Sequence, residues 1–377
     1  MKLRTAMRVA ALGLGLALPA AAQVAPDHPG RAVYNKTCAT CHDNPGTTRA
    51  ATLASIQQQA PARLREVLTT GVMAPMAANL KPQEITDVIA FLTAGQAANA
   101  APWTDAIRCA ADKRAVSPSA TIVSAGFGVD QNQSRSLSAA QAGLTKANLA
   151  NLEVAWSIAT PGQSGGAGAS VLSDGTIFIA LAQQVLALDA KTGCAKWTYA
   201  GSTRSTPAIG EIGSRKVVTL AIGSDVHVLD ASTGALVWKA SWQPIKGAGG
   251  HVRGGVIFAK DKIIVPVSSS GSTSGSKPDF ECCTGHGTVV ALSAADGKHM
   301  WEYHTKPDAQ YNGQISSLGV KQKGPSGAAI WSVPAFDAKR NRVIVTTGES
   351  TSHPGTDTSN AIISIDADTG KVAWQFQ

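Results

Sequence analysis

The clearest chemistry in this 377-residue chain is in the pentapeptide Cys38-Ala39-Thr40-Cys41-His42. Two cysteines one helical turn apart can form thioethers to the two vinyl groups of a haem, and the adjacent histidine can then bind the iron. A C-x-x-C redox pair and a chance match are the alternatives. The pattern predicts covalent haem c, attached at Cys38 and Cys41 with His42 as an iron ligand.

Helices are expected downstream of this motif. An apolar face runs along residues 62–71, and a second one follows Pro82, which suits a first helical turn, with Gly95 past the end of the pattern. Residues 29–95 thus resemble a class I cytochrome c. This resemblance implies an axial methionine between the helices. Met73 fits the expected spacing to Leu80, and Met76 is the second candidate.

Outside the haem motif the chain has four cysteines, which allow three pairings: Cys109, Cys194, Cys282 and Cys283. A bond between the adjacent Cys282 and Cys283 would be strained, and strain of this kind is concentrated at functional sites. The alternatives are that each bridges separately to Cys109 or Cys194, or stays a buried thiol. In either case the Cys-Cys pair marks a candidate site.

Most of the remaining chain is built from a repeat. Residues 185–197, VLALDAKTGCAKW, combine an apolar run, a turn segment containing Ala and Gly, and a closing Trp, which predicts strand, tight turn and strand. Self-similarity at about 40 residues is typical of a β-propeller. The alternative for such a propeller is a scaffold that binds other proteins. The four copies end at Trp197, Trp238, Trp301 and Trp374.

The repeats account for about four blades. Residues 152–156, LEVAW, look like the last strand of a further copy. Because half a propeller leaves open sheet edges, we expect the chain to be truncated. The family resemblance described below implies a complete propeller about twice as long, of eight blades.

The N-terminal residues indicate export. Residues 1–22 combine basic residues, an apolar core and small residues, which is typical of a signal peptide, and no other stretch is apolar enough to span a bilayer. We therefore expect a periplasmic or secreted protein with disulfides. The predicted divisions are a cytochrome domain at 23–95, a linker at 96–102 and a propeller domain at 103–377.

The charge distribution argues against nucleic acid as a partner. The formal net charge is +8 at pH 7, but Lys and Arg are scattered and form no basic run. A mildly basic, solvated surface explains the excess.

Together these features resemble the quinohaemoprotein alcohol dehydrogenases, and most of all their cytochrome-fused polyvinyl alcohol dehydrogenases. The resemblance covers nearly the whole mature chain and rests on residues 252–267, 281–301 and 324–350. It implies two further cofactors, pyrroloquinoline quinone (PQQ) and Ca²⁺.

The resemblance also implies roles for individual residues. A Cys282–Cys283 disulfide would cover one face of the quinone and Trp331 the other, although Trp331 could equally be a blade-core aromatic. Glu349 would bind Ca²⁺, for which a carboxylate is a suitable ligand; the alternative is a solvated glutamate in a loop. His286 stands where the family usually has an arginine that contacts the quinone.

The implied reaction is oxidation of an alcohol or polyol, with electrons passing to the haem and then to a periplasmic acceptor such as a soluble cytochrome. The catalytic base is the weakest match. Asn360 stands where the family tends to have Asp, and Asp357 is the substitute candidate, although a turn-forming role suits it equally. An electron-transfer or scaffold protein with a degenerate propeller that binds no quinone is the alternative.

Overall fold

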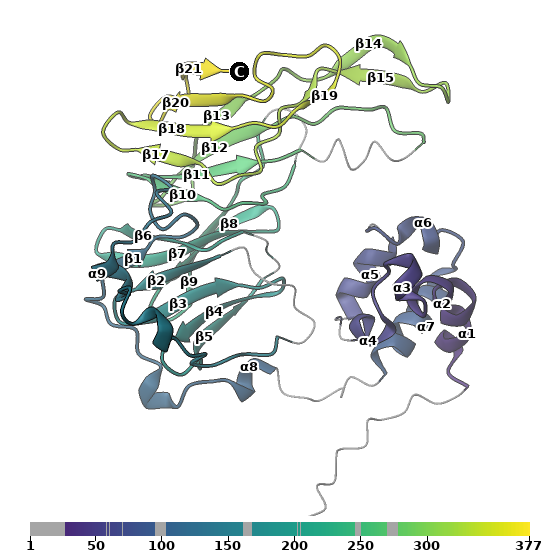
Figure 1. Cartoon of the computed structure of the whole chain (residues 1–377). Coiled ribbons are helices and arrows are strands. Elements are labelled where there is room, and N and C mark those ends of the chain that lie inside the picture. The colour runs from purple at the N-terminus through teal and green to yellow at the C-terminus, as the bar shows by residue number, and fades with distance from the viewer. Residues whose placement is uncertain are drawn as a thin grey trace, which may run out of the picture. The chain divides into compact units, whose positions relative to one another are not determined.

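A computed structural model describes residues 27–57, 59, 61–69, 71–94, 103–160, 168–201, 203, 205–245, 250–269 and 278–377. The chain forms two compact units, residues 1–100 and 101–377, drawn in Figure 1. The predicted signal peptide and linker lie outside the described residues.

The first unit is helical, as predicted. Helices α1 and α7 pack together at Gly30, where a Cβ atom would lie 1.9 Å from the backbone oxygen of Asp87. The apolar side chains of α1, α5 and α7 form its core, with Tyr34 and Val88 fully buried. The helices are α1 (Pro29–Thr37), α2 (Ala39–His42), α3 (Pro45–Thr48), α4 (Leu53–Ile56), α5 (Pro61–Thr69), α6 (Ala74–Ala77) and α7 (Pro82–Thr93).

The second unit consists of antiparallel sheets in which consecutive strands pair, the blade pattern of a propeller (Figure 1). The first sheet contains β1 (Ile122–Ser124), β2 (Ala169–Leu172), β3 (Thr176–Ala180), β4 (Gln184–Asp189) and β5 (Ala195–Ala200). The second contains β6 (Ala208–Ile212), β7 (Arg215–Ile222), β8 (Asp225–Asp230) and β9 (Leu236–Ser241). The third contains β10 (Ile257–Ala259), β11 (Lys262–Val267), β12 (Thr288–Ser293) and β13 (His299–His304). The fourth contains β17 (Ala335–Asp337), β18 (Arg342–Thr346), β20 (Ile362–Asp366) and β21 (Val372–Phe376).

Short elements connect and decorate the blades. The short helices are α8 (Trp103–Ala106) and α9 (Ala139–Ala142). Two small sheets are added to the blades: β14 (Gln310–Ile315) with β15 (Lys321–Gly324), and β16 (Ser326–Gly327) with β19 (Ser350–Ser352). β14, β15 and β16 lie between the third and fourth blades in the sequence, and β19 lies between β18 and β20 of the fourth blade.

The repeat motif forms the hairpins that it predicts, β4–β5, β8–β9, β12–β13 and β20–β21. In the first of them the Asp189 carboxylate accepts hydrogen bonds from the backbone of Lys191 and Thr192, and Gly193 has a φ of 73°. Such a conformation favours glycine, because a Cβ atom is disfavoured at positive φ. The motif is therefore a strand–turn–strand unit with a structurally required glycine.

One prediction about the repeats is wrong. Residues 152–160 form no strand, and no ladder between described strands includes them. Trp156 nevertheless behaves like the other repeat tryptophans, since its Nε1 donates to the backbone oxygen of Ala190, at 2.8 Å. Its side chain also covers Gly193.

A disulfide joins Cys109 to Cys194, and a second joins Cys282 to Cys283. The first attaches the segment after α8 to the β4–β5 hairpin, where Cys109 N–H also donates to Ala195. The structure thus selects the vicinal pairing among the alternatives that the sequence left open.

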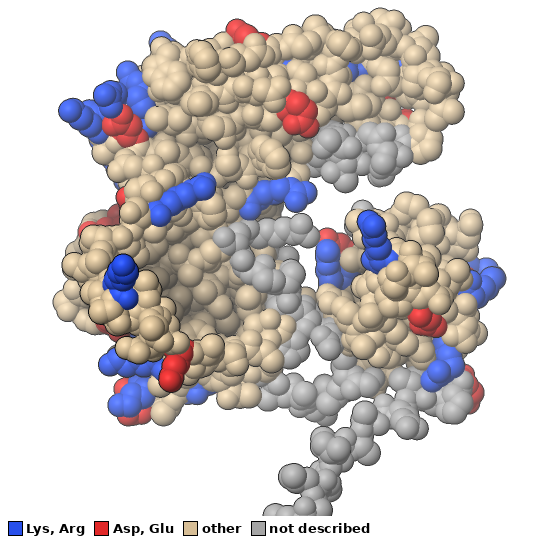
Figure 2. Space-filling model, viewed as in Figure 1, with Lys and Arg blue, Asp and Glu red and all other residues tan. Residues whose placement is uncertain are grey.

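The surface agrees with the scattered charges of the sequence. Figure 2 shows Lys and Arg interleaved with acidic and uncharged residues on the visible face, with no continuous basic patch. Among the described residues, no helix has the length and apolar character needed to cross a bilayer.

Candidate haem and quinone sites

The haem motif lies where α1 meets α2. Cys38 closes α1, His42 ends α2, and neither Cys38 nor Cys41 is in a disulfide. The Nδ1 atom of His42 lies 2.7 Å from the backbone oxygen of Ala51. This contact places the proton on Nδ1 and leaves Nε2 for a metal, as in other histidine ligands. The donor set therefore fits a covalently attached haem.

Both candidate methionines lie at the short helix α6. Met73 is its N-cap residue and is half-buried, whereas Met76 lies within α6 and is 64% exposed. An iron ligand must be withdrawn from water, so the burial favours Met73. The axial ligand remains a prediction.

The second site begins at the vicinal disulfide. The segment around it pairs with the end of β15, because Cys283 N–H donates to Lys323 and Lys323 N–H donates to Cys282. Glu281 forms an ion pair with the Lys323 side chain. Cys283 is buried, and the backbone hydrogen bonds to Lys323 fix the position of the disulfide.

Backbone hydrogen bonds join three distant segments at this place. Gly327 N–H donates to Gly285 at 2.9 Å, which connects β16 to the disulfide segment. Ala328 N–H donates to Glu349 at 2.7 Å, and Gly348 N–H donates to Ala329 at 3.0 Å. The structure therefore brings the disulfide segment, the turn before Trp331 and the end of β18 together.

Trp331 is not a blade-core aromatic, because 60% of its surface is exposed. Its indole nitrogen lies beside Gly348, where a Cβ atom would come within 3.6 Å. An exposed tryptophan presents a flat apolar face, which is suited to stacking on a planar ligand.

His286 contributes a buried polar atom without a partner. The residue is 2% exposed, and its Nε2 lies 2.8 Å from Nδ1 of His304. Its Nδ1 has no hydrogen-bond partner among the described residues. Because buried polar atoms are nearly always satisfied, this atom fits contact with a polar ligand group.

Among the described residues, no cluster of acidic, histidine or cysteine side chains marks a Ca²⁺ site. Glu349 is exposed, and no group of three His, Cys, Asp or Glu side chains in the described ranges could hold a metal ion. We therefore derive no step through Ca²⁺.

The candidate base Asp357 lies on the surface. It is exposed, and its Oδ2 accepts a hydrogen bond of 2.7 Å from Gln375 on β21. Asn360 is also exposed and has a φ of 51°. The hydrogen bond of Asp357 therefore points to β21 and not to the disulfide segment, and Asn360 has no carboxylate that could act as a base.

Sequence reasoning missed Lys306, which is only 2% exposed. Its Nζ donates to three hydroxyl oxygens, of Ser350 at 2.9 Å, Thr356 at 2.6 Å and Ser359 at 2.9 Å. Burial lowers the pKa of Lys306, and Asp357 opposes this. No motif marks such a lysine, because its partners come from the fold.

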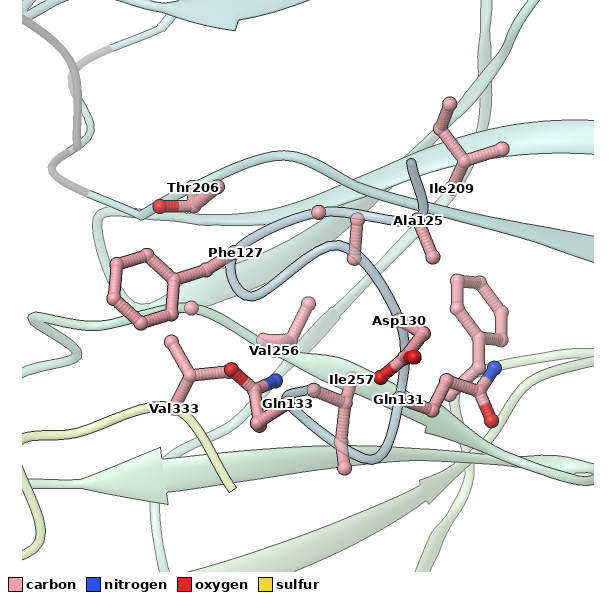
Figure 3. A pocket seen from close by; sticks show the side chains of 14 residues that line it. Ala125, Phe127, Asp130, Gln131, Gln133, Thr206, Ile209, Val256, Ile257 and Val333 are labelled. Atoms are coloured by element: carbon pink, nitrogen blue, oxygen red, sulfur yellow. The ribbon is translucent and has the colours of Figure 1, made fainter. Parts of the chain in front are cut away.

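The cavities of the second unit lie elsewhere. Figure 3 shows one of about 20 Å³, between the loop carrying Phe127 and Gln133, the start of the second and third blades, and Val333. A hollow of about 770 Å³ lies beside α9 and the first strands of the blades, as Figure 2 shows. None of the predicted cofactor residues lines either one.

Two family models match the chain. Residues 25–92 match "Cytochrome C oxidase, cbb3-type, subunit III", and residues 250–377 match "Glucose/ethanol/alcohol dehydrogenase, beta-propeller domain". The first covers the haem motif, and the second covers the vicinal disulfide, His286 and Trp331. These domains imply haem c and PQQ as cofactors.

Two curated relatives are similar along most of the chain. The polyvinylalcohol dehydrogenase of Pseudomonas sp is 31% identical, and that of Sphingopyxis sp. (strain 113P3) is 30% identical, each over 92% of this chain. Each match covers 56% of the relative, so the chain spans about half the length of these proteins.

A solved structure shares the fold. The quinohemoprotein alcohol dehydrogenase ADHIIG from Pseudomonas putida HK5 matches 71% of this chain and 41% of its own, with 19% identity and a TM-score of 0.50. The chain is thus a cytochrome c domain joined to blades of a PQQ-dehydrogenase propeller, and it is similar along most of its length to two polyvinylalcohol dehydrogenases.

Proposed function

We propose that the protein oxidises an alcohol with PQQ bound beside the Cys282–Cys283 disulfide, and passes the electrons to a haem c attached at Cys38 and Cys41. The observation that carries this proposal is the convergence described above. A vicinal disulfide, an exposed tryptophan and a buried, unpartnered histidine nitrogen lie on segments that are hydrogen-bonded to one another.

The chain's own residues would bind and orient the reactants. The disulfide and the indole of Trp331 are suited to the two faces of a planar ring system, and His286 Nδ1 is suited to a polar contact. When bound, PQQ supplies an acceptor for two electrons and the haem accepts them singly. The backbone pairing around Gly327 and Gly348 keeps this constellation rigid, which helps a bound alcohol reach a reactive orientation.

The proposed substrate is an alcohol or polyol, with polyvinyl alcohol as the first one to try because two relatives carry that name. The signal-like N-terminus favours a periplasmic or secreted location, with a soluble periplasmic cytochrome as the electron acceptor. Ca²⁺, with Glu349 as a ligand, belongs to the same proposal.

A titration of the haem-loaded protein tests the function. PQQ and Ca²⁺ are added separately and together, then a short primary alcohol, a short secondary alcohol or polyvinyl alcohol, while the haem absorbance is followed. We expect reduction only when quinone and alcohol are both present. An intact haem spectrum with no reduction under any combination would contradict the proposal.

A second candidate is an electron-transfer or scaffold protein that binds no quinone. The positions of Asn360 and Asp357 favour it, because the structure brings neither to the disulfide segment as a base. Quinone binding separates the two: quenching of tryptophan fluorescence by PQQ, lost in Trp331→Ala, supports the enzyme.

A further inference from the structure

Four titratable side chains of the third blade form a continuous chain. His286 Nε2 lies 2.8 Å from His304 Nδ1, and His304 Nε2 lies 3.1 Å from Glu302 Oε1. The other oxygen of Glu302 lies 3.2 Å from His299 Nε2. The two contacts with Glu302 are electrostatic, since they lack the alignment of full hydrogen bonds.

The strand geometry explains how these groups meet. Glu302 and His304 are two residues apart on β13, so their side chains share one face. His299 would point to the opposite face, but Met300 is an extra residue in the pairing of β13 with β12. Such a bulge reverses the alternation and turns His299 toward Glu302.

The chain runs from the interior toward solvent. His286 is 2% exposed, whereas the side chains of His304, Glu302 and His299 are 23%, 13% and 23% exposed. The inner end lies three residues after Cys283, and its backbone pairs with Gly327. It therefore begins within the segments that hold the proposed quinone site.

The surroundings determine which nitrogens carry protons. Burial opposes ionisation of Glu302, but contacts led by the N–H of Ile245, followed by His304, outweigh it and keep the pKa of Glu302 below its ordinary value. A lone pair facing this carboxylate at 3.1 Å would be repelled, so His304 carries its proton on Nε2. Its Nδ1 is then an acceptor.

The same reasoning extends to His286. Because Nδ1 of His304 accepts, Nε2 of His286 must donate, and the lone pair of a neutral His286 is then on the unpartnered Nδ1. Burial lowers the pKa of His286, followed by the charges of His304 and Lys306, while Asp308 opposes them. His286 is therefore neutral at neutral pH and able to accept a proton.

We infer that His286, His304 and Glu302 form a relay that removes the hydroxyl proton of the alcohol from the quinone site to solvent. The inference rests on the proposed function and assigns the base role that Asp357 leaves open. His286 Nδ1 takes the proton, directly or through a bridging water. The proton on its Nε2 then moves to His304 Nδ1, and that on His304 Nε2 moves to Glu302 and from there to solvent. His299, whose Nε2 faces the other oxygen of Glu302, holds this carboxylate in place.

The step balances. The O–H bond and the carbinol C–H bond of the alcohol break, and the C=O π bond forms. The hydroxyl hydrogen leaves as a proton to His286, and the carbinol hydrogen leaves with its electron pair to the quinone, which is the oxidant. The product is an aldehyde or ketone. When the proton reaches water, His286 and His304 are left with their protons on Nδ1, and rotation of each ring or proton exchange with water restores the starting Nε2–H tautomers.

The first test uses ¹⁵N NMR of histidine side chains in the quinone-free protein. We expect His286 as the Nε2–H tautomer, and we expect Glu302→Gln to change the ¹⁵N signals of both His286 and His304. A proton on Nδ1 of neutral His286 would overturn the relay.

The second test follows haem reduction by alcohol in the quinone-loaded protein between pH 5 and 9. A general base contributes a factor of about 10² to 10⁴, so we expect His286→Gln to lower the rate at least about 100-fold. Glu302→Gln should lower it less and change the acid limb of the pH profile. The exposed His353→Gln is the matched control and should match wild type.

Chemical reduction of the haem by dithionite should be equal in all variants, which shows that haem loading is intact, and urea unfolding followed by tryptophan fluorescence should show that the blade unit is folded in each. An active wild type with an unchanged rate and pH profile in Glu302→Gln would overturn the relay alone. A wild-type protein that oxidises none of the alcohols would overturn the proposed function and the relay with it.

Discussion

The indole Nε1 of Trp301 donates a hydrogen bond of 2.9 Å to the backbone oxygen of Ala367, 66 residues further along the chain. The preceding repeats make the same contact one blade apart, for example from Trp197 to Ala231 at 3.0 Å. Each time a motif glycine lies under the indole, as Gly370 does under Trp301. The repeat motif therefore encodes both a hairpin and its contact with the neighbouring blade.

Replacing Gly370 by Ala should destabilise the blade unit by more than a backbone effect. Gly370 has a φ of 71°, and a Cβ atom would lie 2.8 Å from the Trp301 ring. The left-handed conformation costs about 1–2 kcal/mol with a side chain, and overpacking adds about 1–3 kcal/mol. Urea unfolding followed by tryptophan fluorescence measures the sum.

The matched control for this substitution is Gly213→Ala. Gly213 has a φ of 61°, and a Cβ atom there would meet nothing within 4 Å. It should therefore show the backbone cost alone. Equal losses in the two variants would contradict the indole contact as a stabilising feature.

Removal of one disulfide should lower the stability of the protein, and removal of the other should weaken its binding of PQQ. Removing Cys109–Cys194, which closes a loop of 85 residues, should cost about 2–5 kcal/mol in the free energy of unfolding. Removing the vicinal pair by Cys282→Ser should instead weaken PQQ binding and leave the haem spectrum unchanged.

Denaturation with urea and fluorescence titration with PQQ check both halves of this expectation. The variant Cys109→Ser with Cys194→Ser serves as the control for quinone affinity, which it should not alter. If Cys282→Ser lowers stability as much and leaves PQQ affinity intact, the vicinal pair is only structural.

Haem ligation should respond differently to the two methionines. Because methionine ligation opposite histidine raises the reduction potential, Met73→Ala should lower the haem midpoint potential markedly, and Met76→Ala should leave it near wild type. His42→Ala should abolish the normal haem absorbance. Spectroelectrochemical titration measures both, and a shift only in Met76→Ala would reassign the ligand to Met76.

The blade unit should lose stability in mild acid. Burial lowers the pKa of His286 and of His227 from 6.5 in the folded protein. Below about pH 6.5 the unfolded chain therefore binds more protons than the native one, so the free energy of unfolding falls as the pH falls. Each buried histidine contributes at most about 1.4 kcal/mol per pH unit.

Urea unfolding at intervals from pH 7.5 to 5 measures this slope. His286→Asn should reduce it, because an asparagine does not titrate, whereas the exposed His353→Gln should not. A slope unchanged in His286→Asn would show that His286 does not stay neutral in the folded protein.

The sequence alone determined what depends on local pattern. The haem motif, the helices around it and the strand–turn–strand repeats follow from spacing, apolar periodicity and glycine at a tight turn, because these signals act over a few residues. The strand predicted at residues 152–156 failed, since a strand also requires a partner, and local pattern does not specify one.

Only the tertiary structure decided what depends on long-range neighbours. It paired Cys109 with Cys194, placed the Asp357 carboxylate in a hydrogen bond with Gln375, and buried Lys306 among hydroxyl groups. It also placed His304 against His286, because β13 returns beside the start of β12. Burial and electrostatic environment arise from such packing, so the residue types could name candidates for the site but not their protonation or partners.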